Sequence, residues 1–379
     1  MAQKKDKKRL SGRFAIFITA LLVVCTVVFL NNQFAQGSIK RFAYWIFSGI
    51  RGDATETSVS FDANDYNRFT LISGNLCIVS PDNISSYRLS GKSSMNAPVL
   101  LRNPAISSSS SRFLAYDLGG LNFYVANNKK ILFDGSTDSR IINANMNSSG
   151  DFAIITDSED SKSLVTLYNS SFKPIYKFHS SEKYIFDASV SPNGKSAAIV
   201  TYGTEDGQFK SFLSLCKTDS EGFYVTHLLG TSVPLRVSYH SDRRILVICD
   251  DKTVLFDNSG AVVAEISHDG LPVKAFSESY GKHTALLLDN YGNGGNTRVI
   301  FIKDNGEISS PLDFDEDIYS ISSAGNFTSL QFSDKCVVYK NDLTKLSEFK
   351  ITADISRCMV NSDGSVISIS DNFAALYIE

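Results

Sequence analysis

The sequence contains few of the residues that build catalytic or metal sites. Only five of its 379 residues are histidine, and no two of them have the short spacing of a metal-ligand pair. The nucleophile-elbow, phosphate-loop and dinucleotide-binding patterns are absent. We therefore predict no catalytic residue, no metal site and no cofactor, and an enzyme is the less favoured class of function.

Cysteine is also sparse. There are six cysteines and no Cys-x-x-Cys pair, so neither a zinc site nor a redox motif is indicated. Cys25 lies in an apolar run near the amino terminus, and the other five are widely spaced, mostly within apolar strand patterns. We expect these five to be buried free thiols, because free cysteine behaves as a small hydrophobic residue.

The chain has no large excess of either charge. Its net charge is −3, so no global field favours nucleic acid, and we predict no nucleic-acid partner. The balance nevertheless hides a local excess, because residues 1–13 form a basic tail with six positive side chains. They are Lys4, Lys5, Lys7, Lys8, Arg9 and Arg13.

The basic tail is followed by a charge-free run at residues 14–30, which is 17 residues long and near the short limit for crossing a bilayer core of about 30 Å. Only Lys40, Arg41 and Arg51 follow soon after it. The positive-inside rule then predicts a single transmembrane helix with a cytoplasmic amino terminus and an extracytoplasmic domain. A signal peptide cleaved near Ala35-Gln36-Gly37 is the alternative.

Residues 31–53 form a juxtamembrane segment with apolar positions at helical spacing between Ile39 and Ile50. Tyr44 and Trp45 would suit the membrane interface, which favours a helix lying on the outer leaflet. A stalk helix that packs on the following domain is the alternative.

From residue 54 to residue 379 one pattern returns about every 40 residues: a tight turn, then a short apolar strand. The turns lie near residues 74, 111, 150, 194, 242, 281, 325 and 364, with spacings of 37 to 48 residues. Gly, Asn and Asp supply the backbone angles of such turns. A period in the low forties with several short strands is typical of β-propeller blades. The eight turns predict an all-β, eight-bladed propeller, with seven blades as the alternative.

The two ends of this region are irregular in complementary ways. The last repeat stops one strand short, whereas Thr57–Phe61 has strand alternation and no partner in its own repeat. An open sheet edge favours aggregation. We therefore expect Thr57–Phe61 to be the outermost strand of the blade built from residues 355–379.

The turn Ser191-Pro192-Asn193-Gly194-Lys195 resembles the Ser-Pro-Asp-Gly-Lys turn of WD-repeat-like bacterial propellers. The Trp-Asp dipeptide of true WD repeats is absent, and the only tryptophan, Trp45, lies outside the blades, so the tryptophan docking motif of quinoprotein dehydrogenases is absent too. The layout resembles uncharacterised bacterial single-pass membrane proteins with an exported propeller. That resemblance implies fold and location and assigns no catalytic residue.

Two acidic stretches partly match calcium-binding loops. Asp313, Asp315, Glu316 and Asp317 lack the glycine and glutamate of an EF-hand, and Asp289 with Asn293 is a partial match only. We expect solvated loops at both places.

The best candidates for a binding site are three polar loops, 157–162, 202–209 and 290–296, between the second and third strands of their repeats. Propeller connectivity brings all three to one face of the disc, and loops on a rigid scaffold often carry binding sites. Ordinary variation in hairpin length is the alternative. The candidate binding residues are Asp157, Glu159, Asp160, Tyr202, Glu205, Asp206, Tyr291 and Asn293.

These observations favour a membrane-anchored, extracytoplasmic module that binds or scaffolds a protein or cell-envelope partner with basic or cation-bridged groups. The alternative is an exported enzyme with its site in the propeller channel. A cluster of titratable side chains at the channel mouth would favour the enzyme.

Overall fold

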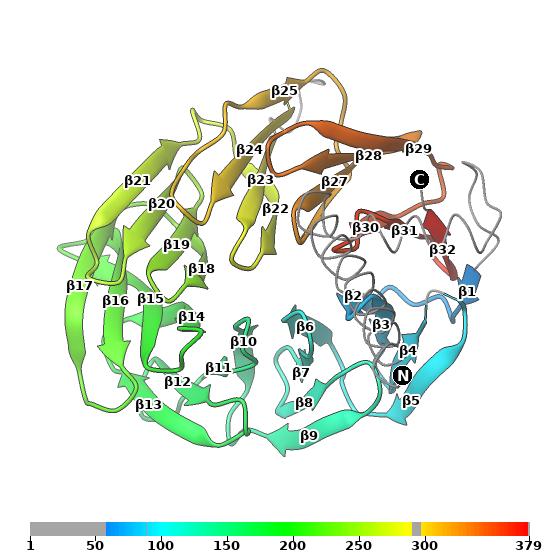
Figure 1. Cartoon of the computed structure of the whole chain (residues 1–379). Coiled ribbons are helices and arrows are strands. Elements are labelled where there is room, and N and C mark those ends of the chain that lie inside the picture. Colours follow the sequence, from blue (N-terminus) through cyan, green and yellow to red (C-terminus); the bar gives the residue numbers. More distant parts are fainter. Residues whose placement is uncertain (1–57, 89, 290–296, 378–379) are drawn as a thin grey trace, which may run out of the picture.

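The computed structural model describes residues 58–88, 90–289 and 297–377. Over these residues the chain forms 32 strands in eight four-stranded antiparallel sheets, arranged as blades around a central channel (Figure 1). The eight-bladed all-β fold predicted from the repeats is confirmed. The predicted tail, span and juxtamembrane segment lie outside the described residues. Within the described part of the chain, no helix has the length and apolar character needed to cross a membrane.

Each blade contributes strands A to D from the channel outward. In blades 1 to 4 they are β2 (Arg68–Ile72), β3 (Asn75–Val79), β4 (Asn83–Tyr87) and β5 (Ser93–Pro98); β6 (Pro104–Ser108), β7 (Phe113–Asp117), β8 (Asn122–Ala126) and β9 (Ile131–Ser136); β10 (Ile141–Met146), β11 (Phe152–Thr156), β12 (Ser163–Tyr168) and β13 (Pro174–Ser180); β14 (Tyr184–Val190), β15 (Ser196–Glu205), β16 (Gln208–Lys217) and β17 (Phe223–Gly230).

Blades 5 to 8 follow the same order. Their strands are β18 (Pro234–Ser241), β19 (Arg244–Cys249), β20 (Lys252–Asp257) and β21 (Val262–Ser267); β22 (Val273–Ser279), β23 (His283–Asp289), β24 (Thr297–Lys303) and β25 (Leu312–Phe314); β26 (Ser320–Ala324), β27 (Phe327–Gln331), β28 (Lys335–Lys340) and β29 (Lys345–Lys350); β30 (Arg357–Val360), β31 (Val366–Ile369), β32 (Phe373–Tyr377) and β1 (Ser58–Ser60).

Burial of the strands explains the sequence pattern. In blades 2, 3, 6, 7 and 8 every residue of strand B is buried, because this strand is covered by a neighbouring blade on each face. Outer strands such as β21 instead alternate exposed and half-buried residues. The short apolar strand that follows each turn in the sequence is therefore strand B of a blade.

The repeated turns of the sequence are the A–B hairpins, and all eight lie where they were predicted. Six of the eight contain a glycine with positive φ, at residues 74, 150, 194, 281, 325 and 364. At Gly325 a side chain would also meet the backbone of Ser362, with a Cβ only 3.1 Å from its carbonyl oxygen. Glycine is therefore required there by both angle and space.

The ring closes as predicted from the two irregular ends. β1 pairs antiparallel with β32, with Val59 opposite Ala374, and the Phe61 amide donates to the Asn372 carbonyl oxygen at 3.0 Å. Figure 1 shows β1 beside β32 at the rim. Residue 57, the first of the predicted strand, lies outside the described residues.

The core is divided among the blade interfaces, with one apolar cluster at each of the eight junctions. The cluster between blades 8 and 1 joins Ile367 and Ile369 to Leu76 and Ile78, so the first and last blades are packed as well as hydrogen-bonded. The five described cysteines are buried free thiols, as expected.

Strand direction defines two faces of the disc. The A–B and C–D turns lie on one, here the AB/CD face, and the B–C turns and blade-to-blade connections lie on the other, the DA/BC face. Ser60 pairs with Phe373, which begins β32 just after a B–C turn, so β1 runs from the AB/CD face to the DA/BC face. The chain therefore enters the propeller at the AB/CD face.

Candidate functional site

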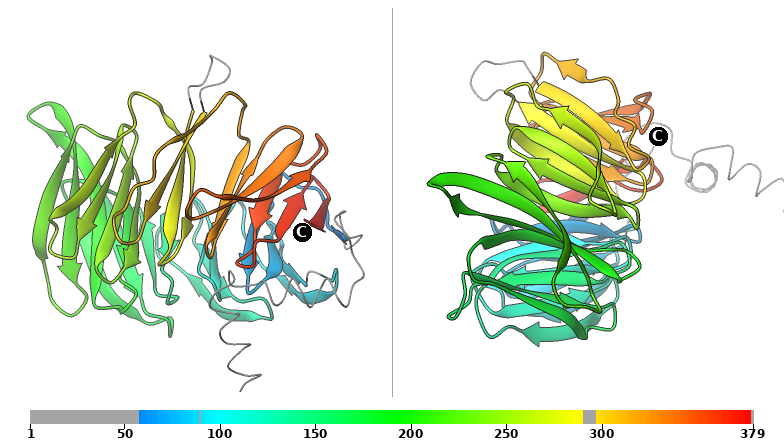
Figure 2. Two further views of the ribbon diagram at one scale, coloured as in Figure 1. Left: turned by 45° about the horizontal axis from the view of Figure 1, so that its top comes forward. Right: turned by 90° about the vertical axis from the view of Figure 1, so that its left-hand side faces the viewer.

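The most prominent feature of the DA/BC face is the hairpin of β15 and β16, whose strands are ten residues long against three to eight elsewhere. It projects beyond the other blades (Figure 2). The prediction of a loop at 202–209 is wrong, because these residues form the end of a β-hairpin. Strand pairing continues to Glu205 opposite Gln208. Asp206 and Gly207 alone make the turn, with φ of 53° and 74°, as in the tight turns that Asp-Gly favours.

One side of this hairpin is aromatic. The Tyr202 ring stacks on Tyr184 and on Phe209 with centroid distances of 5.6 and 5.8 Å, and Phe186 meets it edge-on at 6.3 Å. Tyr184 is 44% exposed. Four rings thus form an aromatic cluster that partly faces solvent, and aromatic side chains are enriched at recognition sites.

The opposite side of the hairpin carries charge. Lys183 Nζ lies 2.9 Å from Glu205 and 4.1 Å from the centre of the Phe212 ring, and Lys210 Nζ lies 3.7 Å from Glu205 and 3.6 Å from Asp206. The hydrogen bond from Lys183, with the charge of Lys210, lowers the pKa of Glu205. The two predicted carboxylates at the hairpin tip are therefore already paired with lysines.

Loop 157–162 of blade 3 lies beside the aromatic side of the hairpin. Lys162 Nζ is 4.6 Å from the centre of the Tyr184 ring, which places the two elements together. Glu159 and Asp160 are exposed, and neither they nor Asp157 form an ion pair among the described residues. The structure thus joins two of the three predicted loops into one surface, the hairpin surface: loop 157–162, Tyr184, Phe186 and residues 202–209.

The third predicted loop, 290–296, lies outside the described residues, together with the candidates Tyr291 and Asn293. Asp289, at its described edge, pairs with Lys274. In the other acidic stretch, Asp313 pairs with Arg298 and Glu316 with Lys335. Among the described residues, no three His, Cys, Asp or Glu side chains gather as a metal site.

A titratable cluster lies in the channel wall, where the enzyme alternative would place its site. Asp187 accepts from the Val237 amide at 2.9 Å and from Asn143 at 3.2 Å, and lies 3.6 Å from Arg236. Arg236 also donates to Asn145 at 2.9 Å and pairs with Glu278 at 3.3 Å.

Burial and neighbouring charges shift the pKa values of Asp187 and Arg236. Desolvation raises the pKa of the buried Asp187 carboxyl, while Arg236 and two backbone amides act in the opposite direction. Desolvation lowers the pKa of Arg236, but Asp187 and Glu278 outweigh it and the net shift is upward, so the guanidinium stays charged. Every charged group here has a protein partner, so the cluster acts as a structural tie between blades.

Tyr280 forms further hydrogen bonds between blades on opposite sides of the axis. From the A–B turn of blade 6 its hydroxyl reaches the Met146 carbonyl of blade 3 at 3.0 Å and the Ser108 carbonyl of blade 2 at 3.3 Å. Asn145 of blade 3 likewise donates to the Val237 carbonyl of blade 5 at 3.0 Å. Blades 2, 3, 5 and 6 are therefore linked through the axis of the disc.

Three buried histidines also make structural contacts. His240 Nε2 lies 2.6 Å from Thr284 Oγ1, His283 Nε2 lies 2.7 Å from Thr328 Oγ1, and His268 Nε2 lies 2.9 Å from Thr253 Oγ1. The first two bonds join neighbouring blades. None of these three histidines pairs with a carboxylate and a serine within the described residues, as a hydrolase triad would require.

Sequence reasoning missed the aromatic partners of Tyr202. Tyr184 and Tyr202 are cross-strand neighbours. A bulge between Ile185 and Asp187 shifts the strand register, so this pairing does not follow from counting residues back from the turn. The alternation of Tyr184 and Phe186 was the available signal.

Eight four-stranded blades, with one long hairpin that projects from blade 4, define the chain as an eight-bladed β-propeller. Residues 50–374 match the family described as "Family of unknown function (DUF5711)", and the chain belongs to this family. A comparison with curated protein sequences finds no match.

Solved structures share the fold. The chain is similar to BamB from Moraxella catarrhalis, with 9% identity, a TM-score of 0.53 and coverage of 87% of this chain and 100% of that one. It is also similar to the C-terminal WD40 domain of Sif2, with 10% identity, a TM-score of 0.59 and coverage of 86% and 99%. At these identities the likeness shows the fold alone, and it agrees with the resemblance to WD-repeat-like propellers.

Proposed function

We propose that this protein is a membrane-anchored, extracytoplasmic binding module that holds a protein or cell-envelope partner on its hairpin surface. The observation that carries the proposal is the aromatic cluster in which Tyr202 and Phe209 of the β15–β16 hairpin pack with Tyr184 and Phe186 of β14. Exposed aromatic side chains supply large contact area at low entropic cost, because each has only two side-chain torsions. The paired strands β14, β15 and β16 hold the four rings in place.

The proposed anchor is the apolar run at residues 14–30, with six basic residues before it and three soon after it. The described chain begins at Ser58 on the AB/CD face, and the hairpin surface lies on the DA/BC face. An anchor entering at the AB/CD face would point the hairpin surface away from the membrane and toward a partner in the envelope.

The channel cluster does not favour the enzyme alternative. Asp187 is fully buried, and the side chains of Arg236 and Glu278 are only 16% and 10% exposed. A general acid or base must reach the atom it protonates or deprotonates. These groups instead bond to one another and to neighbouring strands.

The proposal can be tested by crosslinking the membrane-bound full-length protein and recovering its partners. Replacing Tyr184 and Tyr202 with alanine should reduce partner recovery several-fold, because it removes the exposed stack. Tyr224→Ala is the matched control, since Tyr224 is 41% exposed on the outer strand of the same blade. If the Tyr184/Tyr202 variant recovered as much partner as wild type, the hairpin surface would not be the contact site.

The acidic part of the surface is tested separately. Neutral replacements of the five carboxylates should weaken recovery and its dependence on salt, because attraction between exposed charges is screened. Most of the effect should come from loop 157–162, whose carboxylates lack lysine partners among the described residues. Salt-independent recovery by wild type would contradict this contribution. The carboxylates are Asp157, Glu159, Asp160, Glu205 and Asp206.

A further inference from the structure

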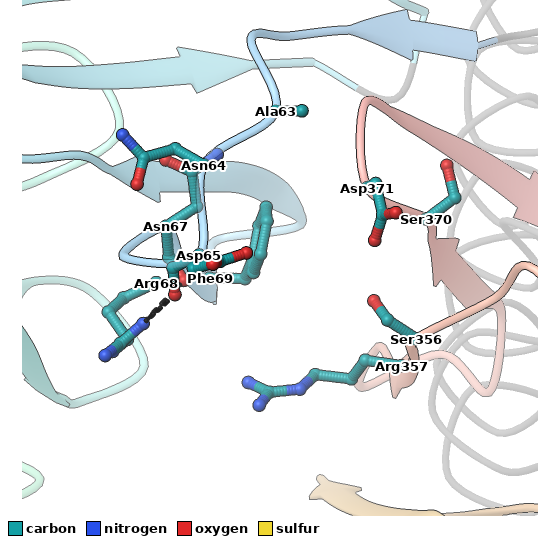
Figure 3. Close-up of a pocket in the computed structure, with 10 residues that line it drawn as sticks. All are labelled: Ala63, Asn64, Asp65, Asn67, Arg68, Phe69, Ser356, Arg357, Ser370 and Asp371. Carbon is teal, nitrogen blue, oxygen red and sulfur yellow. Dashed lines mark hydrogen bonds between the residues drawn. The ribbon is translucent and has the colours of Figure 1, made fainter.

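A second concave site lies on the DA/BC face, on the channel side of the junction between blades 8 and 1. It encloses about 500 Å³, a volume within the usual range for small-molecule sites. The start of β2, the start of β30 and the turn between β31 and β32 form its walls (Figure 3). It is separate from the hairpin surface, which belongs to blades 3 and 4.

Two arginines supply the positive charge of this pocket. Arg68 is held by bonds from one terminal nitrogen to the backbone carbonyls of Asp65 and Asn67, at 3.0 and 3.1 Å. Its other donors remain available for a ligand. Arg357 is exposed, and among the described residues it has neither a hydrogen-bond acceptor nor an ion-pair partner.

The two guanidinium groups interact electrostatically. Arg357 is open to solvent, but its guanidinium lies in a concave site with protein around it. That protein environment and then the charge of Arg68 lower the pKa of Arg357. Like charges held together in this way are unfavourable, and an oxyanion placed between them would relieve the repulsion. Arginine is well suited to this task, because its planar fork matches carboxylate and phosphate oxygens.

The rest of the lining limits the kind of anion. Asp65 and Asp371 contribute carboxylates that form no ion pair with either arginine, and Figure 3 places Asp371 away from the guanidinium groups. A polyanion would be repelled by these carboxylates. The Asn64 amide nitrogen has no acceptor among the described residues, and the Ser356 hydroxyl, which donates to Ile369 at 3.0 Å, can still accept. Both suit a hydroxylated ligand.

We infer that this pocket binds a small hydroxylated molecule with one oxyanionic group, such as an acidic sugar, with the oxyanion between Arg68 and Arg357. The site exists only in the closed ring, because its two arginines come from the first and last blades. It does not depend on the partner proposed for the hairpin surface.

Calorimetric titration of the detergent-purified full-length protein tests this inference with three probes: glucuronate, glucose 6-phosphate and neutral glucose. Saturable binding of either anion, and not of glucose, is expected. Binding of glucuronate alone would assign a carboxylate, glucose 6-phosphate alone a phosphate, and both a general oxyanion site. Binding of glucose as tight as that of the anions, or binding of none of the three, would overturn the inference.

Variants locate the site. Arg357→Gln and Arg68→Gln should each weaken binding about tenfold or more, since each removes charge-assisted hydrogen bonds. Arg357→Lys keeps the charge without the fork and should fall in between. Arg243→Gln, at an exposed arginine of the AB/CD face, is the matched control. Unchanged anion binding by Arg357→Gln would place the ligand elsewhere.

Thermal unfolding without a ligand gives an independent readout. Arg357→Gln should melt no lower than wild type, because it removes only a repelled, unpaired charge. Arg68→Gln can loosen the turn at residues 65–67, so Arg357→Gln is the decisive variant. A clear loss of stability in Arg357→Gln would contradict the repulsion on which the site depends.

Discussion

At the scale of single residues, the buried polar groups of this propeller join one blade to the next. His283 is an example: it is fully buried, stacks on Phe301 and bonds to Thr328 of the following blade. Burial, with a smaller contribution from His240, lowers the pKa of His283 to about 4. The folded protein therefore keeps this imidazole neutral at pH values where an unfolded chain would protonate it.

This shift predicts acid sensitivity. An unfolded histidine titrates near 6.5, so below that pH the unfolded state binds more protons than the folded state. The contribution of His283 to stability is complete above pH 6.5 and falls by about 1.4 kcal/mol per pH unit until about pH 4. Denaturant unfolding of His283→Gln between pH 7 and 4.5 should show a shallower decline than wild type. The exposed His179→Gln is the control, and equal slopes for His283→Gln and wild type would contradict the assignment.

The channel cluster gives a second prediction at this scale. Arg236→Met leaves Asp187 and Glu278 in the channel wall without their cation, and breaking a buried pair in this way costs about 3 kcal/mol or more. Denaturant unfolding at neutral pH should show that loss. Arg243→Met, at an exposed position, should stay within about 0.5 kcal/mol of wild type. A stable Arg236→Met variant would mean that the cluster does not hold the blades together.

At the scale of strands and turns, the sequence predicts what depends on local chemistry. Most A–B turns need a glycine with positive φ, as at Gly325, and this residue is visible in the sequence. The positions of the turns and the number of blades could therefore be predicted. The closing strand was also predictable, because a missing strand at one end matched a spare strand at the other. The long β15–β16 hairpin was not predictable, because the polar residues before Gly207 resemble a loop. Strand pairing there uses backbone groups, which the side-chain pattern does not report.

The candidate sites depend on contacts that sequence spacing does not contain. Tyr184 contacts Tyr202 in a strand pairing that includes a bulge, and Arg68 and Arg357 line one pocket only after the ring has closed. Of the predicted binding residues, the structure brings those of two loops together and finds Glu205 and Asp206 already paired with lysines.

The closing strand supplies a prediction at the scale of an element. Val59 is the buried residue of β1, with exposed serines on either side. Val59→Lys should weaken the pairing with β32, and deletion of residues 54–62 should uncover that edge and cause aggregation. Light scattering on heating measures both. Val262→Lys, on the outer strand β21 where Val262 is 45% exposed, should behave as wild type. A soluble, monomeric deletion variant would contradict the role of β1 as the closing strand.

At the scale of the whole molecule, the proposed topology has one span at residues 14–30 and the propeller outside. Protease added to intact cells should digest the propeller or its stalk and spare the first dozen residues, which an amino-terminal epitope tag would report. The control is the same digestion after lysis, where the tag should be lost. A soluble species beginning near Ser38 would support the cleaved signal peptide in place of the anchor.

The position of β1 also determines how the disc would respond to mechanical tension. In the proposed arrangement the tether pulls on Ser58 at one face while the partner pulls on the hairpin surface at the other. This force runs along β1, and the hydrogen bonds of an antiparallel ladder are perpendicular to the strands. Its bonds to β32 would therefore be strained together in shear and not peeled apart one by one. Under tension, the short strand that closes the ring would hold through all of its bonds at once.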